Sequence, residues 1–123
     1  MADHNEFGKI AEELAADYLA KKGYKVLIKN YRYRKAEVDI IAAFQNQIII
    51  VEVKARQNDS VMEPQEAVNK KKIKLLIAAA NAFVEEKNIE KEVRFDIISV
   101  LPNEKGKLVI THIENAFEAI DAN

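Results

Sequence analysis

The sequence contains no cysteine, which excludes disulfide bonds and metal sites built on thiolates. Glycine and proline are also scarce, with three and two residues among 123, whereas charged residues make up 32% of the chain. This composition is typical of a well-ordered α/β or α+β domain and excludes a fibrous or low-complexity chain. At this length we expect a single domain over residues 1–123.

Long apolar runs are absent as well. No run approaches the ~18 residues that a membrane span requires, and the first residues lack the basic and then apolar pattern of a signal peptide. We therefore expect a cytoplasmic protein that does not enter a membrane. The formal net charge is only -1, so attraction to a polyanion would have to come from local basic patches.

Apolar residues spaced by three and four predict two helices. The first runs from about residue 5 to Lys22, and Gly23 suits the positive φ that often ends a helix. The second opens at 64–68 and continues to about residue 87, with several lysines in its first half. The tail at 114–120 suggests a further short helix.

Five apolar segments predict strands, at 24–28, 37–43, 48–54, 93–101 and 107–113. The link between the second and third strands is short enough for a hairpin, and residues 102–106 form a turn between the last two. The order of elements predicts an α/β sandwich in which helices flank a mixed sheet of about five strands.

The predicted hairpin carries charged residues in otherwise apolar strands. If Gln45 and Asn46 form its turn, Asp39 lies opposite Glu52, with Cβ atoms ~5 Å apart. A turn shifted by one residue places Asp39 opposite Lys54 instead. Because strand side chains alternate with a period of two, all three charged side chains point to one face in both registers.

Two adjacent carboxylates in apolar strands repel each other, and each costs several kcal/mol to desolvate. Lys54 compensates one charge, and Mg²⁺ or Mn²⁺ would compensate more, since such ions take carboxylates, water and phosphate oxygens as ligands. The carbonyl of Val53 lies between the two functional side chains and is a further potential ligand. A cation there would polarise a phosphodiester while Lys54 orients water or stabilises charge. On spacing alone, a structural ion pair explains these residues equally well.

Several motifs occur in order along nearly the whole chain. They comprise Gly8 to Leu19, GlyTyr at 23–24, AsnTyrArg at 30–32, GluValAspIleIle at 37–41, ValGluValLysAlaArg at 51–56, GluAlaVal with Lys72, ArgPheAsp at 94–96 and HisIleGluAsnAlaPhe at 112–117. Together they resemble the YraN family, a group of uncharacterised bacterial proteins assigned to the PD-(D/E)xK nuclease superfamily. The resemblance implies a restriction-endonuclease-like three-layer sandwich, similar to archaeal Holliday junction resolvases.

The same resemblance implies roles for four residues of the chain. Asp39 and Glu52 would be catalytic, metal-binding carboxylates and Lys54 the catalytic lysine. Glu12, on the first helix, would face the same site and complete the metal ligands.

The chain departs from the usual pattern at three positions. Ala11 and Ala36 stand where the family usually has glycine, which is a small steric change. Val38 stands where the superfamily has proline before the aspartate.

Basic residues gather in two stretches. Seven of them, and no acidic residue, lie between Lys21 and Lys35, interleaved with three tyrosines, and a second group comprises Lys70, Lys71, Lys72 and Lys74. These stretches suit a phosphate-binding groove, although a solvated surface is the simpler alternative. We expect Arg34, Arg56 and Lys72 to contact nucleic acid, because the sequence places them near the active edge.

Three other polar residues receive a structural interpretation. Arg94 and Asp96 share one face of the fourth predicted strand and are expected to form an ion pair. His112 is a lone histidine in a strand, more typical of a structural residue than of a metal ligand.

The first hypothesis for function is a metal-dependent endonuclease acting on DNA, with branched, nicked or damaged DNA suggested by analogy. The alternative is a nucleic-acid-binding module of the same fold without catalysis, within a repair or recombination assembly. A third interpretation is a structural protein whose charges pair internally. RNA as the ligand and a homodimeric state stay open at this point.

Overall fold

The computed structural model describes residues 4–56, 69–118 and 121. Two helices and five strands follow one another in the described chain: α1 (His4–Lys21), β1 (Lys25–Tyr33), β2 (Ala36–Phe44), β3 (Gln47–Ala55), α2 (Lys70–Glu86), β4 (Glu92–Pro102) and β5 (Leu108–Phe117). The predicted order of elements is confirmed. Neither of these helices combines the length and the apolar character needed to cross a membrane.

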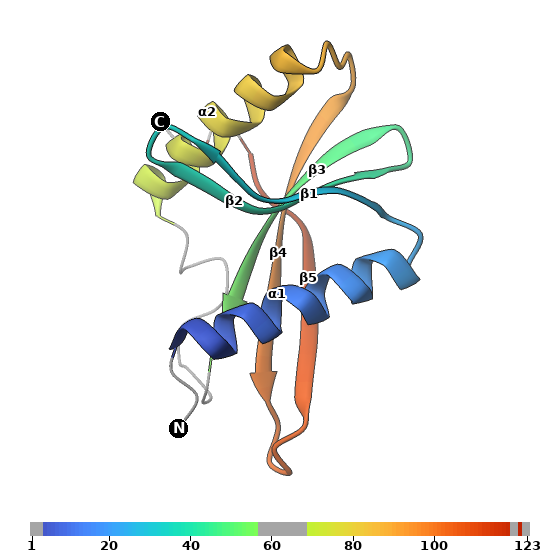
Figure 1. The fold of residues 1–123 in the computed structure, drawn as a ribbon, viewed down its shortest axis with the longest axis vertical. Helices are drawn as coiled ribbons and strands as arrows, with labels where there is room; N and C mark the ends of the chain where they lie inside the picture. Colours follow the sequence, from blue (N-terminus) through green and yellow to red (C-terminus); the bar gives the residue numbers. More distant parts are fainter. Residues whose placement is uncertain (1–3, 57–68, 119–120, 122–123) are drawn as a thin grey trace.

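The strands form one sheet in the order β1-β2-β3-β4-β5. β3 and β4 are parallel, and the other neighbouring pairs are antiparallel. The parallel pair needs a crossover connection, and this connection contains α2. The two helices lie on opposite sides of the sheet (Figure 1), so the chain forms the predicted three-layer sandwich of the restriction-endonuclease-like kind.

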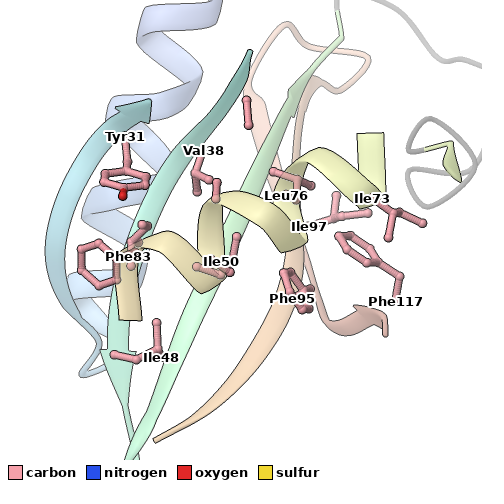
Figure 2. Packing of buried hydrophobic residues seen from close by; sticks show 14 residues of the cluster. Tyr31, Val38, Ile48, Ile50, Ile73, Leu76, Phe83, Phe95, Ile97 and Phe117 are labelled. Atoms are coloured by element: carbon pink, nitrogen blue, oxygen red, sulfur yellow. The ribbon is translucent and has the colours of Figure 1, made fainter. Parts of the chain in front are cut away.

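Each face of the sheet packs against one helix. On one face, α1 contributes mainly small residues, with Ala11, Ala15 and Leu19 fully buried. On the other face, α2 contributes larger side chains, and Figure 2 shows Ile73, Leu76 and Phe83 on α2 in front of the strands. The two cores meet at the central strands.

β3 supplies alternate residues to the two cores. Ile48 and Ile50 belong to the α2 core, whereas Ile49 and Val51 belong to the α1 core. A strand buried on both faces is apolar at successive positions, which explains the continuous run of isoleucines. Any charged residue that continues this strand therefore enters a largely buried environment.

The turn between β2 and β3 sets the register of the candidate site. Gln45 and Asn46 both have positive φ, 47° and 64°, as in a type I′ hairpin turn. Phe44 pairs with Gln47, which confirms the first of the two predicted registers. Gly23, with φ of 94°, ends α1 as expected.

Two predictions about element boundaries need correction or fall outside the described chain. Residues 114–117 continue β5 and are not the start of a helix, because Phe117 pairs with Phe95 and their rings lie 5.1 Å apart between centroids. The predicted opening of the second helix at 64–68 lies outside the described residues. The described helix begins at Lys70, after Asn69 as its N-cap.

Candidate active site

Asp39 and Glu52 lie where the regular pairing of β2 with β3 ends. The last recorded pair is Ile40 with Val51, so Asp39 and Glu52 are the next residues on their strands. Beyond that pair, the backbone N–H of Val53 donates a hydrogen bond to Oδ2 of Asp39, at 2.7 Å. The carboxyl group of Asp39 therefore contacts β3 at the point where the two strands part.

Glu52 is buried, and two lysines compensate its charge. Only 4% of its side chain is exposed, and the Nζ atoms of Lys54 and Lys72 each lie 3.3 Å from the same oxygen, Oε2. Lys54 shares the α2 face of β3 with Glu52, as the strand alternation predicted. Lys72 reaches the same carboxylate from the first turn of α2.

Asp39 lacks such cationic partners among the hydrogen bonds and ion pairs of the described chain. Its burial, followed by the negative charge of Glu52, raises the pKa of Asp39 to about 8. The N–H of Val53 favours the ionised form, but a hydrogen bond with Glu52 and the charge of Glu12 oppose it. At neutral pH the side chain of Asp39 therefore holds a proton unless another cation is present.

Glu12 is a neighbour of this pair. Burial, and then the charge of Glu37, raise the pKa of Glu12, with a smaller contribution from Glu52, whereas Lys29 lowers it. Over residues 4–56, 69–118 and 121, no three histidine, cysteine, aspartate or glutamate side chains come close enough together to hold a metal ion. Of the three predicted metal ligands, the structure brings Asp39 and Glu52 together and places Glu12 within electrostatic range.

The chemistry of the carboxyl pair fits a divalent cation. Two carboxyl groups in contact, one with a raised pKa, lose their mutual repulsion when a cation binds between them. Mg²⁺ commonly uses one or two protein carboxylates and completes its shell with water and phosphate oxygens. Asp39 and Glu52 would hold the cation. The backbone carbonyl of Val53, the residue after Glu52, is a further potential ligand.

Comparison with known proteins places the chain in a family. A model described as "Uncharacterised protein family UPF0102" matches residues 11–100. The chain belongs to this family. The resemblance to YraN proteins is thereby confirmed, since they are UPF0102 proteins.

UPF0102 relatives match the chain over nearly its full length. The protein of Christiangramia forsetii is 50% identical over 117 residues, which cover 95% of this chain and 98% of the relative. The protein of Phocaeicola vulgatus is 45% identical over 117 residues, which cover 95% and 96%. Neither UPF0102 name states an activity.

The three predicted nucleic-acid contacts of this UPF0102 chain lie in different places. Lys72 is at the carboxyl pair. Arg56 follows β3, and its backbone N–H donates to the carbonyl of Val100 at 3.0 Å. Arg34 lies in the turn between β1 and β2, with φ of 56° and its guanidinium 5.2 Å from the ring centroid of Tyr33.

Arg34 also lines an open groove of about 920 Å³ between this turn and α2. The lining combines apolar side chains with charges of both signs: Tyr33, Arg34, Lys35, Ala36, Leu75, Ala78, Asn81, Ala82, Glu85 and Glu86. Among the described residues, this lining includes neither Asp39 nor Glu52. This groove therefore does not join Arg34 to the carboxyl pair.

A second buried polar cluster lies on the α1 face of the UPF0102 sheet. Asp96 is fully buried and accepts hydrogen bonds from Nε and Nη2 of Arg94 at 2.9 and 2.8 Å and from the N–H of Asn115 at 3.0 Å. Nε2 of His112 lies 2.7 Å from its Oδ2. Burial raises the pKa of Asp96, but these donors outweigh it and hold the pKa below its ordinary value.

Two tyrosines extend this cluster to α1 and to the residue just before β1. The hydroxyl of Tyr18 lies 3.2 Å from Nδ1 of His112, and Arg94 donates to the hydroxyl of Tyr24 at 2.7 Å. The predicted ion pair of Arg94 and Asp96 is confirmed, but the sequence did not reveal the network around it. The only signal in the sequence was the placement of polar residues at alternate positions of the last two strands.

Proposed function

We propose that this UPF0102 protein is a metal-dependent endonuclease that hydrolyses phosphodiester bonds in DNA. One observation carries the proposal: Asp39 and Glu52 are held together at the parting of β2 and β3, with Lys54 3.3 Å from Glu52. The resemblance to PD-(D/E)xK nucleases supports the same three residues. Membership of UPF0102 assigns the chain to a family but to no reaction, so the nuclease activity must be tested by experiment.

The proposed roles follow from the surroundings of each residue. A divalent cation held by Asp39 and Glu52 would polarise the phosphodiester and help to ionise a bound water. The side chain of Lys54 is 25% exposed, so it is partly open to substrate while its ammonium group contacts Glu52. Lys54 would orient the attacking water or stabilise the negative charge that develops on the phosphate.

Branched, nicked or damaged DNA is the proposed substrate, by analogy with archaeal Holliday junction resolvases. With a net charge of -1, the chain depends on local basic residues to attract DNA. Lys72 at the carboxyl pair, Arg56 just beyond β3 and Arg34 at the open groove are the proposed contacts.

Cleavage of labelled linear, nicked, flapped and four-way-junction DNA with Mg²⁺ or Mn²⁺ tests the proposal. The variants Asp39→Asn and Lys54→Met should each lower the cleavage rate by ~10²-fold or more. Two controls make the same chemical changes at exposed positions: Asp17→Asn on α1 and Lys105→Met in the turn after β4. Both controls should cut as the native chain does.

Three results would redirect the proposal. Undiminished cleavage by both Asp39→Asn and Lys54→Met would show that other residues catalyse the reaction. Binding of DNA by all proteins without cleavage would favour a nucleic-acid-binding module of nuclease fold. Neither cutting nor binding would favour a structural role for the charged residues.

A further inference from the structure

Lys72 occupies a position that the stability of α2 does not explain. Asn69 is the N-cap and accepts a hydrogen bond from the N–H of Lys72, so Lys72 is the third residue of the helix. A capping box would have glutamate or glutamine at this position, and the positive end of the helix dipole disfavours a cation. The first turn nevertheless contains no acidic residue and starts with three lysines, Lys70, Lys71 and Lys72.

The contact made by Lys72 explains this placement better. Its ammonium group lies 3.3 Å from Oε2 of Glu52, the same oxygen that Lys54 approaches at 3.3 Å. Only 4% of the Glu52 side chain is exposed, so the ion pairs are weakly screened by water. Both lysines thus contact the same oxygen of Glu52, which is a predicted ligand of the divalent cation.

Charge balance indicates what a bound cation would change. When a divalent cation is bound, both carboxylates are ionised and balance the charges of the two lysines, so the cation itself leaves an excess of two positive charges. Lys54 lies on β3 only two residues from Glu52, whereas Lys72 reaches it from another layer and is more exposed, at 36% against 25%. Lys72 is therefore the lysine with more freedom to leave.

We propose that Lys72 is an exchangeable counterion, which holds Glu52 until a divalent cation binds and then transfers to a DNA phosphate. This inference rests on the proposed function and adds a consequence to it. Cation and DNA would bind cooperatively, because each favours the conformation in which Lys72 has left Glu52. Lys72 would thus be a positioning residue that couples the two ligands.

Affinities for the two ligands test this exchange without relying on cleavage. Calorimetric titration gives the affinity for Ca²⁺, which binds carboxylate oxygens, and fluorescence anisotropy gives the affinity for a labelled four-way junction with and without Ca²⁺. Gel analysis checks that the DNA stays intact. The proteins are the native chain, Lys72→Gln, Lys72→Arg as the charge-preserving variant and Lys71→Gln, which removes the same charge from the same exposed turn.

Lys72→Gln should bind Ca²⁺ about 3- to 30-fold more tightly than the native chain in the absence of DNA, since a competing charge is gone. Its DNA affinity should respond to Ca²⁺ at least about fivefold less than that of the native chain. Lys72→Arg should retain the native coupling, and Lys71→Gln should leave Ca²⁺ affinity within about twofold. Circular dichroism confirms that each variant is folded.

The failures of the two proposals are distinguishable. Native Ca²⁺ affinity and native coupling in folded Lys72→Gln would overturn the exchange while leaving the nuclease proposal intact. Lack of both DNA binding and cleavage by the native chain would overturn the proposed function and the transfer to phosphate with it. Tighter Ca²⁺ binding by Lys72→Gln would then show competition for Glu52 alone.

Discussion

Asp39 and Asp96 are aspartates in strands of the same sheet, yet their surroundings are opposite in kind. Asp96 receives hydrogen bonds from Arg94, His112 and a backbone N–H, and its pKa lies below the ordinary value. Asp39 receives one backbone hydrogen bond and lies beside another carboxyl group, and its pKa is raised to about 8. The fully buried carboxylate of Asp96 is stabilised by donors of the chain itself, whereas the partly buried carboxyl group of Asp39 has no cationic partner among the described hydrogen bonds and ion pairs.

Burial alone therefore does not separate a structural acid from a functional one. The number and charge of the donors around the carboxyl group make the difference. The hydrogen-bond partners of Asp96 all belong to the chain, and their network joins α1, the residue before β1, β4 and β5. Asp39 needs a cation from elsewhere to become fully ionised near neutral pH, which is a property expected of a binding site.

The largest expected effect is the loss of the completed network. Asp96→Ala removes the common acceptor of Arg94 and His112 and leaves the guanidinium of Arg94, whose side chain is only 12% exposed, without its main partner. We expect the free energy of unfolding to fall by roughly 3–5 kcal/mol, measured by urea denaturation. Asp17→Ala, at an exposed position of α1, should change it by less than about 0.5 kcal/mol. Similar losses in both variants would show that the hydrogen bonds of Asp96 do not stabilise the fold.

A smaller effect, opposite in sign, is expected at Asp39 as the pH rises. The pKa of its side chain is raised from 3.8 to about 8, so between these values the folded protein holds a proton that the unfolded chain releases. Asp39 therefore lowers the stability of the native chain by up to about 1.4 kcal/mol for each pH unit in this window. Asp39→Asn removes this dependence.

Urea denaturation from pH 5 to pH 8 in the absence of divalent cations measures this difference. Asp39→Asn should gain stability relative to the native chain as the pH increases, by a few kcal/mol over the series. Asp96 behaves in the opposite direction: its contribution is present above pH 3.8 and disappears as the pH falls through its lowered pKa. Parallel profiles for the native chain and Asp39→Asn would show that Asp39 is ionised like an ordinary aspartate.

The smallest expected effect concerns the outer part of the network. Tyr18→Phe removes the hydroxyl that lies 3.2 Å from Nδ1 of His112 and should lower the free energy of unfolding by about 1 kcal/mol. When both proteins also carry Tyr18→Phe, the free energies of unfolding with Asp39 and with Asn at position 39 should differ in pH dependence as they do without it. A changed difference would reveal coupling between the two faces of the sheet.

The sequence predicted those features of the candidate site that depend on neighbouring segments. The short link between β2 and β3 left two possible registers, of which the structure has the one with Gln45 and Asn46 in the turn. The alternation of side chains placed Glu52 and Lys54 on one face in both registers. The ion pair of Lys72 with Glu52 was not predicted, because it depends on how α2 crosses the sheet. The contact of His112 with Asp96 was missed for a similar reason, since it needs the pairing of β4 with β5.

Two strand ends were also mispredicted for physical reasons. β1 extends to Tyr33 although its second half is rich in polar residues, because an edge strand buries few of its side chains. Residues 114–117 contain good helix formers, but the packing of Phe117 on Phe95 favours a strand. In both cases tertiary contacts outweigh the local preference of the segment.

The order of the sheet leaves β1 at one edge, and this position has a consequence for behaviour in concentrated solution. β1 exposes Leu27 and Ile28, at 39% and 38%, beside backbone groups that face no further strand of the described sheet. Such an edge invites a strand from a second molecule and thereby aggregation. The irregular pairing between Val26 and Ile28 and the exposed cations Lys25 and Lys29 disfavour that approach. We therefore expect these lysines to disfavour edge-to-edge association of the sheet.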